Sequence, residues 1–271
     1  MSTMTTFDDL NTSLARLSKA VKASATARLK RDKKAAKLLE FAAKEAELMD
    51  WKKGGEVLRN EARQLQLDQE QSLCQRRESL KTHAQRAGVP LQGCEAWDRI
   101  GIFDVRYSGL AVTVELGGVK VESFDEADGE RLFKRLQELH TVLDAPPLDR
   151  KQFFQNIKAA YTTIRRRPSG EGDYVLVHAI HVELLFERAR HDTKFVRNPD
   201  PKNIAPYPLH QFVFDIARFL NDADGPRCGS ERIQTQAPSM RESKATVQIP
   251  NLKNPVSAST SVARLAVVSA S

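Results

Sequence analysis

The chain has 271 residues, of which 41% are hydrophobic and 28% charged, with a net charge of +7 at pH 7. These values are typical of a soluble protein with room for two domains, or for one domain and an extended arm. The apolar runs fall short of the roughly 18 to 20 residues that span a bilayer, so we expect no membrane partner.

The first ninety residues hold most of the positive charge. They contain 18 Lys and Arg against 12 Asp and Glu, and the remaining residues contain 24 against 23. A basic surface favours the binding of phosphate backbones or other acidic partners. The alternative interpretation is that these charges only keep a long helix solvated. The N-terminus MSTMTTFDDL lacks the features of a signal peptide, and the cysteines form no CxxC motif: Cys74, Cys94 and Cys228. These features predict a reducing, cytoplasmic location.

Residues 1–89 predict a helical, coiled-coil arm. They lack proline, and good helix formers dominate. Gly54-Gly55 predicts a turn between two long helices, or a break in a helix that continues. We expect the narrow apolar stripe to pair with a copy of itself or with a partner helix. Its residues follow the 3-4-3-4 spacing of a coiled-coil seam: Phe7, Leu10, Leu14, Leu17 and Val21.

A basic run, ARLKRDKKAAK, is expected inside the first of these helices. Its cations are opposed only by Asp32 and would surround the helix. Phosphate contact is the functional interpretation, without base readout, because no aromatic or amide side chains are interleaved. The predicted nucleic-acid contacts of the arm are Arg28, Lys30, Arg31, Lys33, Lys34 and Lys37.

Residues 95–145 predict a small module of a β-hairpin and a helix. Apolar and polar residues alternate over 112–116 and 119–122, on either side of Gly117-Gly118. Two glycines between such runs indicate a hairpin, because both positions accept positive φ. Residues 100–107 are a candidate third strand, and 126–143 a helix whose apolar face covers the sheet. We expect a packing or docking role for this module.

Residues 149–252 resemble a winged-helix domain in the order and length of their elements. The expected order is a helix, a short strand at 173–177, a second helix, a proline-rich loop and a third helix at 208–221. Two extended segments follow, ERIQTQ and ATVQIP, with a polar stretch between them. The resemblance implies that the third helix and the wing, residues 236–245, contact DNA or a protein partner.

The third helix is expected to expose side chains that can read base edges. Phe214 is expected on the same face, and an exposed phenylalanine suits a protein surface better than DNA. Basic residues of the wing and of the turn after the first helix would reach phosphates. The predicted nucleic-acid contacts of this domain are Arg165, Arg166, Arg167, His210, Gln211, Arg218, Arg241 and Lys244.

His178 and His181 lie three residues apart in an apolar run. A zinc site needs three or four converging ligands. The other candidate ligands match no zinc signature by their spacing: Glu183, His191, His210 and Cys228. We therefore expect a structural role, with His178 at a helix start and His181 at the edge of the core, and no metal or cofactor.

The sequence as a whole predicts a mainly α protein with small β elements, of the α+β class. Residues 253–271, rich in Ser, Ala and Val, predict a disordered tail. No phosphate-loop, serine-nucleophile or zinc-helix motif is found. The predicted function is a non-catalytic, DNA-associated accessory subunit of a nucleoprotein or defence complex, without a small-molecule substrate. The alternatives are a protein-only adaptor or scaffold and a metal-dependent hydrolase.

Overall fold

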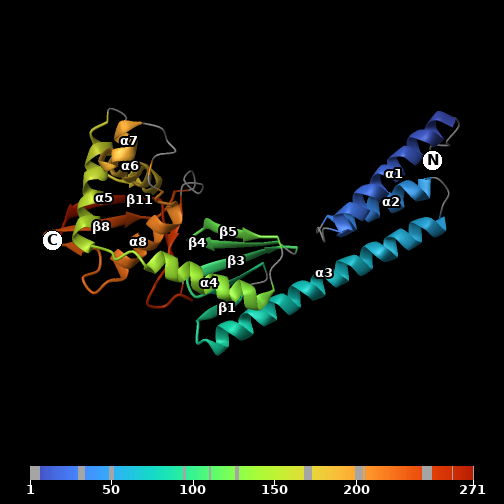
Figure 1. Cartoon of the computed structure of the whole chain (residues 1–271), viewed down its shortest axis with the longest axis horizontal. Helices are drawn as coiled ribbons and strands as arrows, with labels where there is room; N and C mark the ends of the chain where they lie inside the picture. Colours follow the sequence, from blue (N-terminus) through green and yellow to red (C-terminus); the bar gives the residue numbers. More distant parts are fainter. Residues whose placement is uncertain are drawn as a thin grey trace. The chain divides into compact units, whose positions relative to one another are not determined.

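A computed structural model describes most of the chain and divides it into two compact units (Figure 1). The first unit contains the helices up to His83 with residues 107–112 and 123–132, and the second contains 84–106, 113–122 and 133–271. Helices and antiparallel sheets are both present, which confirms the α+β class. The described residues are 7–29, 34–48, 52–93, 96–109, 111–125, 128–167, 173–198, 204, 206–239, 246–257 and 259–270.

The described residues of the N-terminal part form three helices, α1 (Phe7–Leu29), α2 (Ala35–Leu48) and α3 (Lys52–Arg86). The prediction that the basic run lies inside one long helix is wrong, because the run falls where the chain passes from α1 to α2. Residues 30–33 of the run lie outside the described part of the chain. The turn expected at Gly54-Gly55 is also wrong, since both glycines lie in the first turn of α3.

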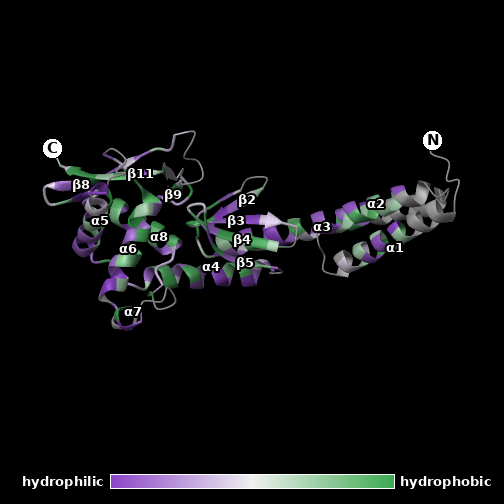
Figure 2. Ribbon diagram, turned by 90° about the horizontal axis from the view of Figure 1, so that it is seen from above, coloured by the Kyte–Doolittle hydropathy of each residue, from purple (hydrophilic) through white to green (hydrophobic). Residues whose placement is uncertain are grey.

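Helices α1 and α2 lie side by side and pack through small apolar side chains (Figures 1 and 2). Leu17 and Ala20 of α1 form a buried cluster with Ala42 of α2. Small side chains at the contact let two helix axes approach closely. Apolar side chains also remain exposed in this unit, among them Phe41 at 49% and Leu67 at 58%. A coiled coil with a second copy or a partner helix stays a prediction.

Among the described residues, the first sheet has five strands in chain order, with β2 (Trp97–Ile100) antiparallel to β1 (Leu91–Gly93) and to β3 (Phe103–Ser108). In the fourth strand Val112, Val114 and Leu116 are fully buried, as their alternation predicts. Gly117 and Gly118 follow with φ of +59° and +78°, which confirms the predicted turn. The fourth strand is β4 (Ala111–Leu116), and the fifth is β5 (Val119–Phe124).

Helix α4 (Gly129–Asp144) follows the sheet. Phe133 and Leu136, on the apolar face of the helix, are buried, whereas Val142 is 64% exposed. Arg135 pairs with Glu122 of β5 at 2.9 Å and ties this helix to the sheet.

The remaining helices are α5 (Arg150–Arg165), α6 (Val177–His191), the short α7 (Thr193–Arg197) and α8 (Leu209–Asn221). The side chain of Asp149 caps α5 by accepting a hydrogen bond from the backbone N–H of Gln152 at 2.9 Å. Phenylalanines of α5 and α8 form the core between these two helices. The rings of Phe154 and Phe219 stack with their centroids 6.0 Å apart.

Two further sheets are present among the described residues of the second unit. One has the order β6 (Val175–Leu176), β11 (Arg264–Ser269), β8 (Glu231–Gln236) and β7 (Arg227–Cys228), and the other pairs β9 (Val247–Ile249) with β10 (Thr260–Val262). The prediction of a disordered tail at 253–271 is therefore wrong.

Strand β11 was not predicted, because both of its faces are covered. It pairs with β6 on one side and β8 on the other. Its neighbouring residues Leu265 and Ala266 point to opposite faces and are both buried. A strand buried on both faces has no alternation of polar and apolar residues to detect.

The two segments expected to flank a wing do not pair with each other. Strand β8 lies between β11 and β7, and β9 pairs with β10. The expected wing hairpin of β8 and β9 is therefore wrong. Most of the stretch between them, residues 240–245, lies outside the described part of the chain. The winged-helix resemblance of the whole region stays a prediction.

Candidate functional site

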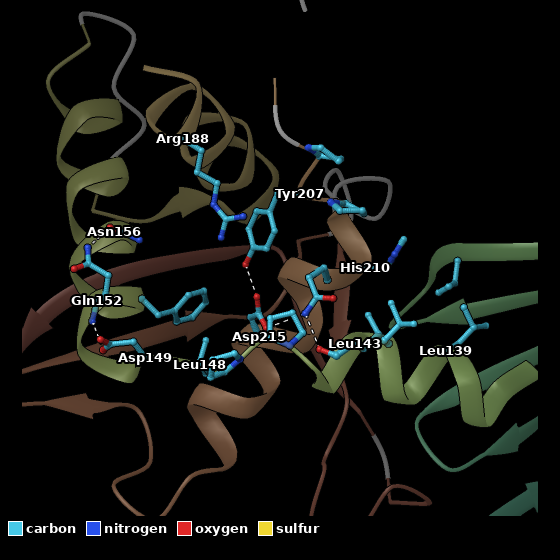
Figure 3. Close-up of a pocket in the computed structure, with 18 residues that line it drawn as sticks. Leu139, Leu143, Leu148, Asp149, Gln152, Asn156, Arg188, Tyr207, His210 and Asp215 are labelled. Atoms are coloured by element: carbon cyan, nitrogen blue, oxygen red, sulfur yellow. Dashed lines mark hydrogen bonds between the residues drawn. The ribbon is translucent and has the colours of Figure 1, made fainter. Parts of the chain in front are cut away.

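The candidate site is a cleft around Tyr207 in the second unit, with a volume of about 500 Å³ (Figure 3). Pro146 and Pro147, after α4, and Pro208, before α8, supply rigid backbone at its edge. Polar residues come from α5, α6 and α8. The apolar wall consists of Val121, Leu139, Val142, Leu143 and Leu148.

Tyr207 and Asp215 form the buried polar centre of this cleft. The Tyr207 hydroxyl donates to Asp215 Oδ2 at 2.7 Å, and Gln211 Nε2 donates to Asp215 Oδ1 at 3.1 Å. Burial raises the pKa of the Asp215 carboxyl, and the two donors offset part of that rise. Burial, followed by the charge of Asp215, raises the pKa of the Tyr207 hydroxyl, which therefore stays a neutral donor.

His181 supports Tyr207 from α6. Its Nε2 donates to the Tyr207 backbone carbonyl oxygen at 2.7 Å, and its ring stacks on Phe212 at a centroid distance of 5.3 Å. Burial is the main reason why the pKa of His181 is lowered. The predicted position of His181 at the edge of the core agrees with its exposed fraction of 9%.

Arg188 covers the ring of Tyr207. Its guanidinium carbon lies 3.6 Å from the ring centroid, and Figure 3 shows the side chain reaching from α6 toward the tyrosine. A second cleft of about 640 Å³ adjoins the first. The two clefts share five lining residues, and we call the two adjoining clefts together the Tyr207 groove: Gln152, Phe153, Asn156, Arg188 and Tyr207.

The residues predicted to read DNA from α8 are half-buried, and two of them bond to backbone groups of the protein itself. Phe214 is only 2% exposed, so the prediction that it faces solvent is wrong. Gln211 also donates to the Leu143 carbonyl oxygen at 3.0 Å, and Arg218 donates to that of Pro146 at 2.8 Å. His210 is half-buried, and burial lowers its pKa.

The physical reason is that α8 is buried almost all round. Its residues 212–217 are consecutively buried, because the helix packs on α5 and α6 and is also held to the end of α4. The amphipathic pattern of the sequence suggested one buried face. Gln211 and Arg218 consequently bond to backbone groups near α4 instead of facing solvent.

The basic turn after α5 is exposed but largely paired. Arg165 forms an ion pair with Asp173 at 3.0 Å, and Arg167 pairs with the buried carboxylate of Glu183. Arg166 is exposed at the end of the helix. The ion pairs leave this turn less free to bind phosphate than its sequence suggested.

The predicted nucleic-acid contacts of the arm and the wing are only partly described by the structure. Lys34, just before α2, and Lys37, within it, are described and exposed. Arg28 lies in α1, but its side chain is outside the described part. The others outside the described residues are Lys30, Arg31, Lys33, Arg241 and Lys244.

Among the described residues, no group of three or more His, Cys, Asp or Glu side chains is arranged to hold a metal ion. Within the same residues, no helix combines the length and apolar character needed to cross a bilayer. Comparisons with protein families, with curated proteins and with solved structures return no match.

The central residues of the groove, Arg188, Tyr207 and Asp215, were not predicted from the sequence. One signal was present: Tyr207 lies between Pro206 and Pro208. An aromatic residue held between two prolines has a restricted backbone, which favours an ordered segment over a mobile loop. The contact between Arg188 and Tyr207 could not be predicted, because Arg188 lies on another helix, α6, and no sequence motif indicates it.

Proposed function

We propose that this chain is a non-catalytic binding protein that docks an extended segment of a protein partner in the Tyr207 groove. The observation that carries the proposal is the composition of the groove. Aliphatic side chains and prolines form one wall, and Gln152 and Asn156 of α5 line the part next to Tyr207. Extended peptides bind through apolar pockets and a few placed polar groups, and aromatic residues often line such grooves.

The exposure of the apolar wall supports the same proposal. Val142 on α4 is 64% exposed and lines the groove. The second cleft, which also borders Arg188 and Tyr207, adjoins the first. Two adjoining clefts suit an extended chain, which places successive side chains in each, better than a single compact ligand.

The test uses Val142→Asp, which places a charge on the apolar wall without disturbing a buried residue. A displayed library of random peptides is panned on the wild-type protein, and the strongest binder is synthesised. We expect Val142→Asp to weaken its binding about tenfold, since the removal of a central apolar side chain costs more than about 1 kcal/mol. Val196→Asp is the matched control, because Val196 is equally exposed, at 64%, and does not line the groove.

Two results would count against the proposal. One is a library that yields no binder to the folded protein. The other is equal weakening by Val142→Asp and Val196→Asp, which would show that the peptide lies elsewhere or that charge acts non-specifically.

DNA association is the second candidate function, and the charge of α1 favours it. Arg16, Lys19 and Lys22 are exposed and recur every three residues. No acidic residue occurs between Asp9 and Asp32. Such a stripe suits phosphate contact without base readout. An accessory role in a nucleoprotein complex would combine this stripe with the peptide groove.

A mobility-shift titration with duplex DNA at several salt concentrations tests this candidate. Changing Arg16, Lys19 and Lys22 to Gln should reduce the salt slope by about one for each phosphate that the variant no longer neutralises. Lys134, Lys151 and Lys253, all exposed in the second unit, changed to Gln serve as the control. Equal slopes for the two triple variants would refute a specific role of the α1 stripe.

A further inference from the structure

Arg188 is the single arginine or lysine among the described residues that line the Tyr207 groove. Within the described part of the chain its guanidinium makes no hydrogen bond or ion pair, and its close contact is the face of the Tyr207 ring. An arginine carries five N–H donors in a planar fork, and stacking on a ring leaves their edge available.

The platform under Arg188 is rigid. The hydroxyl of Tyr207 is held by Asp215 at 2.7 Å, and its backbone carbonyl oxygen by His181 at 2.7 Å. Tyr207 is thereby fixed at both ends, and only 5% of its surface is exposed. A guanidinium stacked on a fixed ring loses less conformational entropy on binding than a free surface arginine.

The acidic side chains around the groove already have partners. Asp149 caps α5, Glu187 pairs with Arg190, and Asp215 accepts from Tyr207 and Gln211. Asp192 also has an interaction of its own. Among the described residues, none of these carboxylates forms an ion pair with Arg188, although the charge of Arg188 lowers the pKa of Asp215 from a distance. Within this part of the chain, the edge of the guanidinium has no carboxylate partner and can accept one from a bound peptide.

A neutral amide lies in the same part of the groove. Gln152 Nε2 donates to Asn156 Oδ1 at 2.8 Å, which orients the amide of Asn156 and leaves its NH₂ group as a donor. Arg188 and Asn156 both line the shared section of the two clefts. A guanidinium and an amide donor together suit a carboxylate.

We propose that the peptide bound in the Tyr207 groove carries an Asp or Glu whose carboxylate is held by Arg188, with an apolar side chain against the Leu139 and Val142 wall. This inference rests on the proposed docking function. A side-chain carboxylate fits better than a phosphate group, because Asp149, Glu187 and Asp192 also line the groove and would repel a second negative charge.

The test pans the same displayed peptide library on the wild-type protein, on Arg188→Gln and on Arg188→Lys. We expect wild-type binders to be enriched in Asp or Glu at a fixed spacing from an apolar residue. Arg188→Gln should lose this enrichment, and Arg188→Lys should keep part of it, since lysine retains the charge without the fork. Thermal unfolding of each variant checks that it remains folded.

One recovered peptide, synthesised with its acid and with Gln in its place, gives the quantitative test. The acidic form should bind the wild type about tenfold more tightly than the Gln form, as expected for a charge-assisted hydrogen-bonded pair, and the two forms should bind Arg188→Gln equally. Groove-dependent binders without acid enrichment would overturn the Arg188 inference and leave the docking function standing. Binding insensitive to Val142→Asp would overturn both.

Discussion

Tyr207 and Asp215, eight residues apart in the sequence, are joined by a 2.7 Å hydrogen bond between hydroxyl and carboxylate. The two residues are 5% and 7% exposed. When one partner of such a pair is removed, water cannot replace it freely, so the remaining polar group is left without part of its hydrogen bonding. The bond therefore helps hold α8 and the segment before it in one arrangement.

Tyr207→Phe should lower the free energy of unfolding by about 1–3 kcal/mol, because Asp215 loses a donor and stays buried. Asp215→Ala removes the acceptor. The double variant should lose less than the sum of the two single losses, by about 1 kcal/mol, since each change already breaks the same bond. Urea denaturation followed by circular dichroism measures these values, and strictly additive losses would show that the residues are not coupled.

Arg150 anchors the turn that follows α8. Its guanidinium donates to the carbonyl oxygens of Phe219 at 2.7 Å and of Arg227 at 2.6 Å, and stacks 4.1 Å from the Phe219 ring centroid. Arg150→Lys should cost about 2 kcal/mol of stability, because an ammonium group cannot reach several carbonyls in a planar fork. Chemical denaturation tests this. Lys151→Arg, at the exposed neighbour, is the control and should leave the midpoint unchanged.

Gly117 and Gly118 allow a matched comparison at one hairpin turn. Both have positive φ, but a Cβ on Gly117 would lie 2.1 Å from the carbonyl oxygen of Gln248, whereas one on Gly118 would meet open space. Gly118→Ala should lower the free energy of unfolding by about 1–2 kcal/mol, because alanine must then adopt the left-handed backbone conformation, without a steric clash against other segments.

Gly117→Ala should lower the free energy of unfolding clearly more than Gly118→Ala does, because the backbone of β9 must also move to make room for the Cβ. The hydrogen bond from Gln248 N–H to Gly117 O, now 2.9 Å, would be broken or lengthened. Thermal unfolding of the two variants compares them directly. Equal losses of stability would show that the approach of β9 to this turn does not contribute to it.

His181 makes stability depend on pH. Burial lowers its pKa below the usual value of 6.5, so the unfolded chain takes up the proton at a higher pH than the folded one. Its contribution to stability is complete above 6.5 and falls as the pH decreases below that value. His178 and His210 act in the same direction, since burial lowers their pKa values too.

His181→Gln keeps an amide donor for the Tyr207 carbonyl but cannot be protonated. The variant should therefore lose less stability than the wild type when the pH is lowered from about 7.5 to 5.5. Melting temperatures across this range give the measurement, with His140→Gln, at an exposed position, as the control for the substitution itself. A steeper fall in His181→Gln than in the wild type would contradict the assignment.

Local elements of this protein were predictable because their signals lie within short segments. The β4–β5 hairpin follows from alternating residues around Gly117-Gly118, and helices α4, α5 and α8 from apolar residues at helical spacing. The packing of His181 at the edge of the core was also predictable, since the residue lies in an apolar run at helical spacing.

The amino-acid sequence by itself thus determined the α+β class, most helices and the turn at Gly117-Gly118. Periodicity and turn chemistry act over only a few residues, so a short segment is enough to indicate them. Only the tertiary structure decided that β11 is a central strand, that α8 is buried nearly all round, and that Arg188 lies over Tyr207. These features depend on partners far away in the chain. Pairing and burial of that kind arise when the elements pack, and no single segment carries them.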